Sequence, residues 1–351
     1  MKKIKTPKIV MTFALLVVLS CSKTEENVSL TPPTGEITVD KIVRQASLRN
    51  QLIPFSVLNA AGEDVTEITE FFVDGQEIIG NTFSSPEVGA FEVYGVYSEN
   101  GVLITTNTVP FEVIIPKRKI VVEDYTGTWC GYCPSVAYAV EECHAATNDI
   151  AVVAIHKTAS SNPDPMHFDD IQILQNEFGV SGFPSARINR STVWSSPYEL
   201  SSILSMAGVD TDLAVGILSK LDGSTLSVRV DVVYENGSGT GDKLVVYLLE
   251  SGVIHEQTNY YNSDPTSPYY QQGNPISDFV HNEALRLSLT EVLGDNISAT
   301  AELEEFSKTF TVNIPEEYNS TNLSLVAMVV SADNAAKNAQ FADIDEDKAY
   351  E

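Results

Sequence analysis

The chain has 351 residues, 43% of them apolar, and this size predicts two or three soluble globular domains. Lys and Arg number 21 against 48 Asp and Glu, which gives a formal net charge of −27. So acidic a chain lacks the basic surface that nucleic-acid binding needs. Four cysteines are too few for a scaffold held together by many disulfides.

The amino terminus has the pattern of a lipoprotein signal peptide. Four lysines precede the mostly apolar run Ile9–Leu19, which is shorter than the about 20 residues that span a bilayer. A small residue and Cys21 follow at once, so we expect removal of residues 1–20 and lipid on Cys21. The alternative is an ordinary secretory peptide with an incidental cysteine. Ser22, rather than Asp, after the cysteine favours the outer membrane by analogy with other lipoproteins.

Residues 21–35 are predicted to form a polar tether, and residues 36–115 a small β-sandwich of immunoglobulin-like type. In the second segment, short runs with alternating apolar residues, such as Phe91–Tyr97, are separated by turn signals such as Asp74-Gly75. Strands at regular spacing with turns between them are typical of such sandwiches. The segment contains no pattern that indicates chemistry.

Residues 213–335 show strand patterns again, after the segment 117–212 described below. We expect a second β-sandwich at 213–335. Leu244–Leu249 and Leu323–Val330 are two of its apolar runs. The last segment, 336–351, is expected to be a solvated acidic tail, since its carboxylates lack the spacing of a calcium loop.

Residues 117–212 alternate between strand and helix patterns. Ile120–Val122 and Ala151–Ile155 are apolar runs typical of buried strands, and a helix is expected to begin at Pro134. The predicted order is strand, helix, strand, helix, strand, strand, helix. This order predicts a central α/β domain between the two β-sandwiches.

A Cys-Gly-Tyr-Cys motif lies between the first strand and the first helix of this segment. Cys130 would lie at the helix amino terminus, where free N–H groups and the helix dipole favour a thiolate, the attacking species in disulfide exchange. Cys133, one turn later, would resolve the mixed disulfide. A zinc site needs two more ligands, and no second such motif exists. A purely structural disulfide remains the other alternative.

Cys143 is expected to stay a buried free thiol while Cys130 and Cys133 pair. It lies ten residues beyond Cys133 on the same predicted helix, a separation of about 15 Å at 1.5 Å per residue. Bridged Cα atoms are no more than about 7 Å apart.

The Trp129-Cys130 to Cys133 motif between strand and helix resembles that of the thioredoxin superfamily. The resemblance implies a cis peptide at Phe183-Pro184, in a loop that would hold an extended substrate segment. It also makes Asp124 the buried acid that relays a proton to Cys133; a solvated carboxylate is the alternative.

Over residues 117–335 the chain resembles the Omp-twenty-eight-related family, outer-membrane lipoproteins of Bacteroidetes with a thioredoxin-like core. The matching stretches are Glu123–Gly127, Leu248–Glu250, Phe279–Arg286 and Leu323–Val330. The resemblance implies an outer-membrane location, with the protein facing the periplasm or the cell surface.

Other polar clusters carry weaker signals. His156 would end the second strand beside Cys130 and tune it, or else belong to a polar loop capped by Asp164. The spacing of His167, Asp169 and Asp170 fits no zinc pattern, so we expect neither a metal nor another cofactor. His281 and Arg286 are interpreted as surface or structural residues. Four tyrosines suggest an aromatic surface or a partly buried group: Tyr260, Tyr261, Tyr269 and Tyr270.

Two functional hypotheses follow. The first is an exported thiol-disulfide oxidoreductase for protein or peptide disulfides, with Cys130 and Cys133 catalytic and with Asp124, Trp129 and Phe183-Pro184 supporting. The second is a surface binding or adhesion protein for an unknown ligand, without redox turnover. Both place the protein at the outer membrane through lipid at Cys21.

Overall fold

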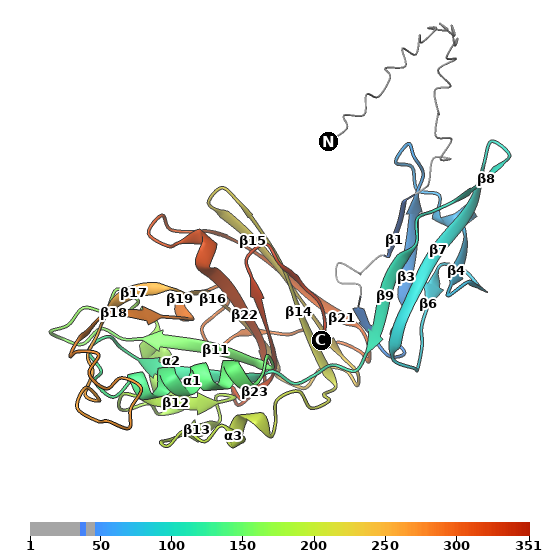
Figure 1. The fold of residues 1–351 in the computed structure, drawn as a ribbon. Helices are drawn as coiled ribbons and strands as arrows, with labels where there is room; N and C mark the ends of the chain where they lie inside the picture. Colours follow the sequence, from blue (N-terminus) through green and yellow to red (C-terminus); the bar gives the residue numbers. More distant parts are fainter. Residues whose placement is uncertain (1–35, 40–45) are drawn as a thin grey trace, which may run out of the picture. The chain divides into compact units, whose positions relative to one another are not determined.

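The computed structural model describes residues 36–39 and 46–351 (Figure 1). The predicted signal peptide, the lipidation site Cys21 and the tether lie outside the described residues. Strand accounts for 45% of the structure and helix for 10%. Within the described ranges, no helix is both long enough and apolar enough to cross a membrane.

The amino-terminal part consists of two packed sheets. A three-stranded sheet has the order β1-β3-β6, and a six-stranded sheet has the order β2-β9-β7-β4-β5 with β8 paired to β7. Phe55 packs between Phe71 and Phe111, with ring centroids 5.9 and 5.7 Å apart. The arrangement fits the immunoglobulin-like sandwich that the alternating pattern predicts. The elements are β1 (Glu36–Val39), β2 (Ala46–Leu48), β3 (Ile53–Leu58), a 3₁₀ turn (Thr66–Ile68), β4 (Glu70–Val73), β5 (Gln76–Ile78), β6 (Thr82–Phe83), β7 (Gly89–Glu99), β8 (Val102–Thr105) and β9 (Val109–Ile114).

A nine-stranded mixed sheet organises the rest of the chain. Its order is β13-β12-β10-β11-β19-β16-β22-β23, with β20 paired to β16. The strands are β10 (Ile120–Thr126), β11 (Ile150–His156), β12 (Ser185–Ile188), β13 (Thr192–Trp194), β16 (Lys243–Glu250), β19 (Ala284–Ser288), β20 (Asp295–Asn296), β22 (Leu323–Val330) and β23 (Ala336–Asp343). The helices are α1 (Pro134–Ala146), α2 (Ile171–Phe178) and α3 (Ser201–Leu204).

The expected fold class, a central α/β thioredoxin-like domain at 117–212 flanked by two β-sandwiches, is wrong. The chain is mostly strand, and β10 to β13 do not close a sheet of their own. Instead β11 pairs in parallel with β19 through Ala154 and Ala284, and the sheet continues into the carboxyl-terminal part. Local periodicity shows which segments are strands but not which distant strand lies beside them, so the sequence suggested a boundary that the sheet crosses.

A four-stranded sheet packs against the carboxyl-terminal strands of the large sheet. Its order is β21-β15-β14-β24, and apolar side chains of β14 and β15 meet those of β16 and β22. Residues 336–351, expected as an acidic tail, contribute β23 and β24. The remaining elements are β14 (Leu213–Asp222), β15 (Thr225–Tyr234), β21 (Glu305–Asn313), β24 (Asp347–Lys348), the β17–β18 hairpin (Val253–Gln257 and Ile276–His281) and a 3₁₀ turn (Ser320–Asn322).

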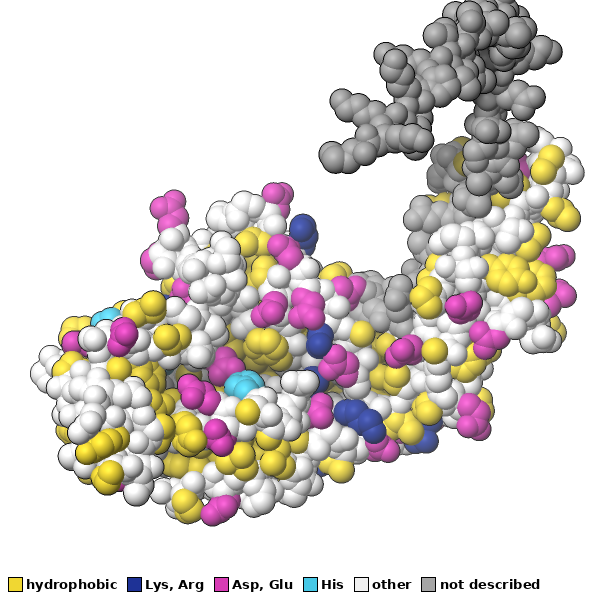
Figure 2. Space-filling view, viewed as in Figure 1, with side chains coloured by type: hydrophobic (Ala, Val, Ile, Leu, Met, Phe, Trp, Pro, Cys, Tyr) yellow, Lys and Arg dark blue, Asp and Glu magenta, His cyan; other side chains and the backbone are white. Residues whose placement is uncertain are grey.

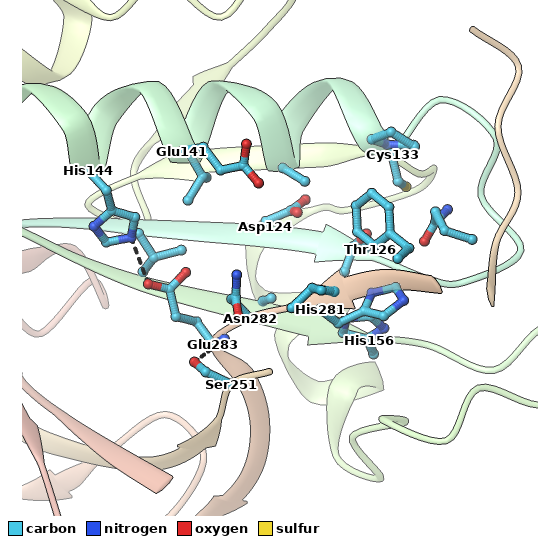
Figure 3. A pocket seen from close by; sticks show the side chains of 18 residues that line it. Asp124, Thr126, Cys133, Glu141, His144, His156, Ser251, His281, Asn282 and Glu283 are labelled. Carbon is cyan, nitrogen blue, oxygen red and sulfur yellow. Dashed lines mark hydrogen bonds and ion pairs between the residues drawn. The ribbon is translucent and has the colours of Figure 1, made fainter. Parts of the chain in front are cut away.

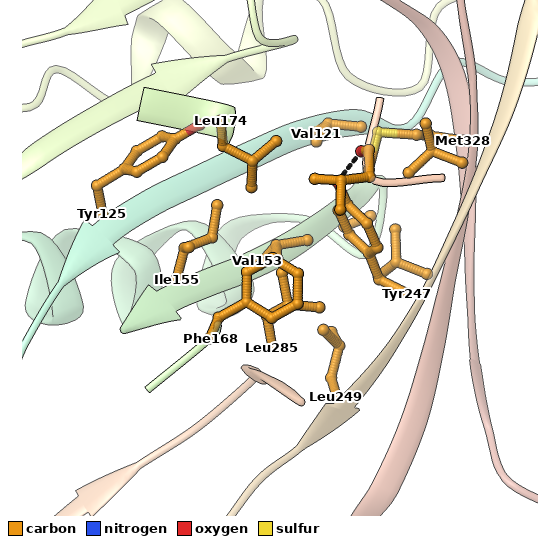
Figure 4. Packing of buried hydrophobic residues seen from close by; sticks show 14 of the residues in the cluster. Val121, Tyr125, Val153, Ile155, Phe168, Leu174, Tyr247, Leu249, Leu285 and Met328 are labelled. Carbon is orange, nitrogen blue, oxygen red and sulfur yellow. Dashed lines mark hydrogen bonds between the residues drawn. The ribbon is translucent and has the colours of Figure 1, made fainter. Parts of the chain in front are cut away.

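Two apolar cores lie on opposite faces of β10 and β11. One joins Val121, Tyr125 and Val153 to α2 and to side chains of β16, β19 and β22 (Figure 4). The other packs the inner face of α1 against Ile120 and Val152. Both strands are buried along their whole length, as expected for strands covered on two faces.

A buried ion pair lies in the first of these cores. Arg190 Nε donates to Glu123 Oε1 at 2.8 Å, and a second guanidinium nitrogen donates to Tyr247 Oη at 2.6 Å. Tyr125 Oη donates to the other Glu123 oxygen at 2.9 Å. Both charged side chains are fully buried. Because Glu123 lies on β10 and Tyr247 on β16, Arg190 links the two halves of the large sheet.

We predict that Arg190→Met and Glu123→Gln each lower the free energy of unfolding by about 3–5 kcal/mol, because either change leaves one charged group buried without its partner. Guanidinium unfolding followed by tryptophan fluorescence measures the loss. The control is Lys220→Met, which removes the exposed pair with Asp345 and should unfold like the wild type. A loss for Arg190→Met no larger than that of the control would contradict the assignment.

We also predict that Cys143 resists alkylation in the native protein. The thiol is unpaired and packs on the core face of α1 with Val136 and Val140. Burial, with a smaller contribution from Glu142, raises its pKa to about 11, so little reactive thiolate exists at pH 8. Peptide mass spectrometry after iodoacetamide should find Cys143 modified only in denaturant. Glu142→Cys, one residue earlier and exposed, should be modified under native conditions.

Candidate functional site

The Cys-Gly-Tyr-Cys motif lies in the turn between β10 and α1, where the sequence places it. Cys130 and Cys133 form a disulfide with a Cα–Cα distance of 5.4 Å. Cys133 is the residue before α1, and Pro134 occupies the first helical position. The Cys133 amide donates to the Cys130 carbonyl at 3.1 Å, which closes the turn.

Asp164 binds the backbone just before this turn. Its Oδ2 accepts from the Thr128 amide at 2.9 Å and lies 3.0 Å from His156 Nδ1. Its Oδ1 accepts from the Met166 amide at 2.9 Å. Burial opposes ionisation, but the hydrogen bonds from His156 and the backbone amides hold the pKa of Asp164 below its usual range. His156 is therefore held by Asp164 within the polar loop.

Trp129 and Phe183 meet beside the disulfide turn. Their ring centroids are 5.6 Å apart, and Trp129 Nε1 donates to the Lys157 carbonyl at 2.6 Å. The Phe183-Pro184 peptide bond is cis, the conformation implied by the resemblance. The structure thus brings Phe183 into contact with Trp129, the residue before Cys130.

The loop at 258–275, between β17 and β18, covers the disulfide turn. Thr258 N donates to the Thr128 carbonyl at 2.8 Å and Tyr260 N to the Gly131 carbonyl at 2.9 Å. Gln257 Nε2 donates to the Cys130 carbonyl at 2.9 Å. A Cβ on Gly131 would lie 2.4 Å from the Tyr260 ring, so only glycine permits this close approach.

This cover leaves the two cysteines almost inaccessible. Cys130 is 4% exposed and Cys133 is 2% exposed. Asn259, itself fully buried, holds the loop in shape: its Nδ2 donates to the carbonyls of Tyr269 and Gly273 at 3.0 and 2.9 Å. A thiol that approaches from the side of the loop therefore meets the loop before either sulfur atom.

Exposed aromatic rings lie on the outer side of the cover. Tyr132 is 55% exposed and Tyr260 is 57% exposed, and their centroids are 5.1 Å apart in an edge-to-face arrangement. Tyr261 contacts Tyr132 at 5.8 Å, and Tyr270 is also exposed. Tyr269 is buried, so only part of the predicted tyrosine surface forms. We call Tyr132, Tyr260, Tyr261 and Tyr270 the tyrosine surface. Figure 2 shows hydrophobic side chains (yellow) on the 258–275 loop.

A cavity of about 240 Å³ lies behind the disulfide, between α1, the ends of β10 and β11, and the β17–β19 segment (Figure 3). Asp124 and Cys133 both line it, as do His281 and Glu283 from the carboxyl-terminal part. At its rim, His144 Nε2 lies 2.6 Å from a Glu283 oxygen. The hydrogen bond to Glu283 raises the pKa of His144 and outweighs desolvation.

Two polar atoms in the cavity wall have no hydrogen-bond partner: Asp124 Oδ1 and His281 Nε2. Burial, together with Glu283, raises the pKa of Asp124 to about 8, so its carboxyl group is protonated at neutral pH. Burial, together with His156, lowers the pKa of His281 to about 3, so that ring is neutral. The cavity thus holds two uncharged polar groups.

Some features of this site were not predicted. Gln257, Glu283 and the 258–275 cover had no recognisable motif, although His281 and Glu283 fall in a stretch that carried the family resemblance. Of the two roles expected for His281, surface or structural, the surface role is excluded, because the side chain lies buried in the cavity wall. Among the residues described, no group of three or more His, Cys, Asp or Glu is arranged to hold a metal ion, and this includes His167, Asp169 and Asp170.

We predict that Asp124 makes stability fall as pH rises. In the unfolded chain the Asp pKa is about 3.9, so the neutral form that the fold prefers contributes fully below that pH and is lost as pH rises through about 8. Relative to Asp124→Asn, the wild-type free energy of unfolding should drop by about 1.4 kcal/mol per pH unit between these values. Denaturant titrations from pH 5 to 9 measure the difference, with the exposed Asp278→Asn as control. Parallel curves for wild type and Asp124→Asn would contradict the prediction.

Comparison with solved structures finds a protein with a similar fold. HBP35 of Porphyromonas gingivalis matches with a TM-score of 0.50 and 16% identity, over 66% of this chain and 77% of that chain. A β-glucosidase from Kluyveromyces marxianus covers 84% of this chain and 44% of its own, at 9% identity and a TM-score of 0.19, too low for a structural argument. Comparison with curated proteins finds no significant match.

The model of one protein family, outer membrane protein Omp28, matches residues 171–348. The match covers just over half of the chain, from α2 to β24, and includes β17, the 258–275 cover and the β18–β19 segment that carries His281 and Glu283. The thioredoxin-type motif at Cys130 lies outside it. This chain belongs to the Omp28 family of outer membrane proteins.

Proposed function

We propose that this protein is an outer-membrane binding protein that holds a polypeptide segment on its tyrosine surface, with the Cys130–Cys133 disulfide as a structural clamp. The observation that carries the proposal is the cover over the disulfide. The sulfur atoms are buried, while Tyr132 and Tyr260 beside them are more than half exposed. A partner that binds at this site therefore contacts the exposed tyrosine rings and not the sulfur atoms.

The tyrosine surface has the properties of a binding hot spot. Tyrosine supplies a large contact area with few rotatable bonds and is enriched among residues that dominate binding energy. Here the rings are attached to backbone that is already ordered, through the disulfide, Asn259 and the contacts of Gln257. Little conformational entropy remains to be lost when a partner binds, which favours affinity.

Attachment and location form part of the proposal. Membership of an outer-membrane family supports an outer-membrane location. We infer that lipid on Cys21 anchors the chain there and that a tether at 21–35 presents the folded part. Which partner binds would depend on charge as well as on aromatic contact, since a net charge of −27 disfavours acidic polypeptides.

A second candidate function is thiol-disulfide exchange. The observation in its favour is the shared cavity: Cys133 and the protonated carboxyl of Asp124 line the same space at the start of α1. In that case a substrate dithiol would reduce the Cys130–Cys133 disulfide and become a disulfide itself. The 258–275 loop would first have to leave Gly131.

The two functions predict opposite results in two assays. Fluorescence anisotropy with labelled, reduced and carbamidomethylated ribonuclease A, an unfolded and basic probe without thiols, measures binding. We expect Tyr132→Ser with Tyr260→Ser to weaken binding at least tenfold, because aromatic anchors are lost. The matched control is Leu103→Ser, which removes an exposed apolar side chain of β8 outside the tyrosine surface.

The redox assay is insulin reduction driven by dithiothreitol. We expect the wild type to match Cys130→Ser, with no acceleration above the uncatalysed rate. In Gly131→Ala, the added methyl group forces the Tyr260 ring away from the turn. This variant tests whether the 258–275 loop prevents thiol-disulfide exchange at Cys130 and Cys133. Turnover by the wild type that is lost in Cys130→Ser, together with unchanged probe binding in the tyrosine variants, would overturn the binding proposal and establish the second function.

A further inference from the structure

The cavity behind Cys133 is not used by the proposed function, and its wall is built for a ligand. Asp124 Oδ1 and His281 Nε2 are buried polar atoms without partners, and both side chains line the same space. Each residue is only 5% exposed. Burying such atoms without a hydrogen bond costs about 1–3 kcal/mol each, which a ligand donor that reaches them would recover.

The lining of the cavity selects the charge of that ligand. Three carboxyl groups face it, from Asp124, Glu141 and Glu283, and neither lysine nor arginine is among its lining residues. His144 at the rim is already paired with Glu283. An anion would find no cationic partner here, whereas a cation would find carboxylates. Part of the remaining wall is apolar and includes Pro134, Ala137, Val140, Val152, Ala154 and Phe279.

We propose that this cavity binds the ammonium group of an alkylamine. The ammonium would donate to Asp124 Oδ1 and His281 Nε2, and its alkyl chain would lie against the apolar wall of α1 and Phe279. An ammonium has three donors and no acceptor, which matches two acceptor atoms that lack donors. Either a free amine or a lysine side chain of a polypeptide supplies this chemistry.

The size and entrance of the cavity fit a small ligand. Its volume of about 240 Å³ is below the about 300 Å³ at which pockets for drug-sized molecules begin. A chain of four or five heavy atoms fits such a space. His144, Val280 and Asn282, which line the cavity, are exposed, so a ligand can enter beside them without displacing the disulfide cover.

The proton on Asp124 gives the site a measurable signature. Because the empty site keeps this carboxyl group neutral at pH 7, an ammonium must displace its proton to gain an ion pair. The amine itself stays charged up to about pH 10, as lysine does. Other titratable groups also line the cavity: Glu141 and His144 from α1, His156 from β11, and His281 and Glu283 from the β18–β19 segment. Tyr198 interacts electrostatically with Asp124.

The test is isothermal titration of the full chain with n-butylammonium chloride and, as its uncharged counterpart, n-butanol. We expect butylammonium to bind at least tenfold more tightly than butanol, and about tenfold more tightly at pH 9 than at pH 7, with proton release at pH 7. Asp124→Asn should lose at least tenfold in affinity for the cation, while Asp278→Asn, an exposed carboxylate of β18 outside the cavity, should retain wild-type affinity.

Equal affinity for butylammonium and butanol in the wild type would overturn the proposal, as would an unchanged affinity in a folded Asp124→Asn variant. The wild-type comparison decides the matter even where a variant does not fold. Titration with Nα-acetyl-lysine methylamide against its norleucine counterpart separates the sources. Binding of the lysine compound assigns the site to polypeptide lysines; binding of butylammonium alone assigns it to free amines. None of these measurements depends on the tyrosine surface, so this proposal and the proposed function fail separately.

Discussion

The buried pair of Arg190 and Glu123 connects the two halves of the large sheet. Strand β11 meets β19 through one residue pair, Ala154 and Ala284, so few backbone hydrogen bonds join the two halves of the sheet. Arg190 adds the connection that the strands lack, since it binds Glu123 on β10 and the Tyr247 hydroxyl on β16. The Tyr247 hydroxyl in turn donates to the Val292 carbonyl at 2.7 Å. A charged pair in an apolar core adds little net stability, but it penalises any packing that separates its partners.

The narrow junction between β11 and β19 also explains where the site lies. Beyond Ala154 and Ala284 the two strands are not paired. The β18–β19 turn just before Ala284 lines the cavity, together with α1 and the strands β10 and β11 (Figure 3). The same divergence lets the β17–β18 hairpin reach the disulfide turn, where Gln257 and the 258–275 loop bind its backbone. Cavity and cover thus both lie beside the weakly paired junction of the sheet.

Local features of the chain were predictable, and distant pairings were not. The strands at Ile120 and Ala151, the helix at Pro134 and the buried face that contains Cys143 follow from periodicity, because burial on each element repeats at its own period. The association of β11 with β19 depends on contacts far apart in sequence, which leave no periodic signal. The 258–275 cover was not predicted for the same reason. Gln257 belongs to no motif, and its role is the hydrogen bond to the Cys130 carbonyl, which is distant in sequence. The sequence left two roles open for His156: tuning Cys130, or belonging to a polar loop capped by Asp164. The contact of His156 with Asp164 is visible only in the structure.

Asp124 is the residue that folding alone explains least. It lies mid-strand, between Ala154 and Ala186 on the neighbouring strands, at a position where an apolar side chain would satisfy the core. Instead the site holds a carboxyl group whose Oδ1 finds no partner and whose ionisation burial opposes. The fold therefore carries a cost at this position and gains no hydrogen bond from that atom in return. Glu123, its neighbour in sequence, shows the contrast: it is also buried, but Arg190 and Tyr125 satisfy both of its oxygens. The proposed ligand would account for this contrast between two neighbouring buried carboxyl groups, since departures from the local rules of packing are most common at functional sites.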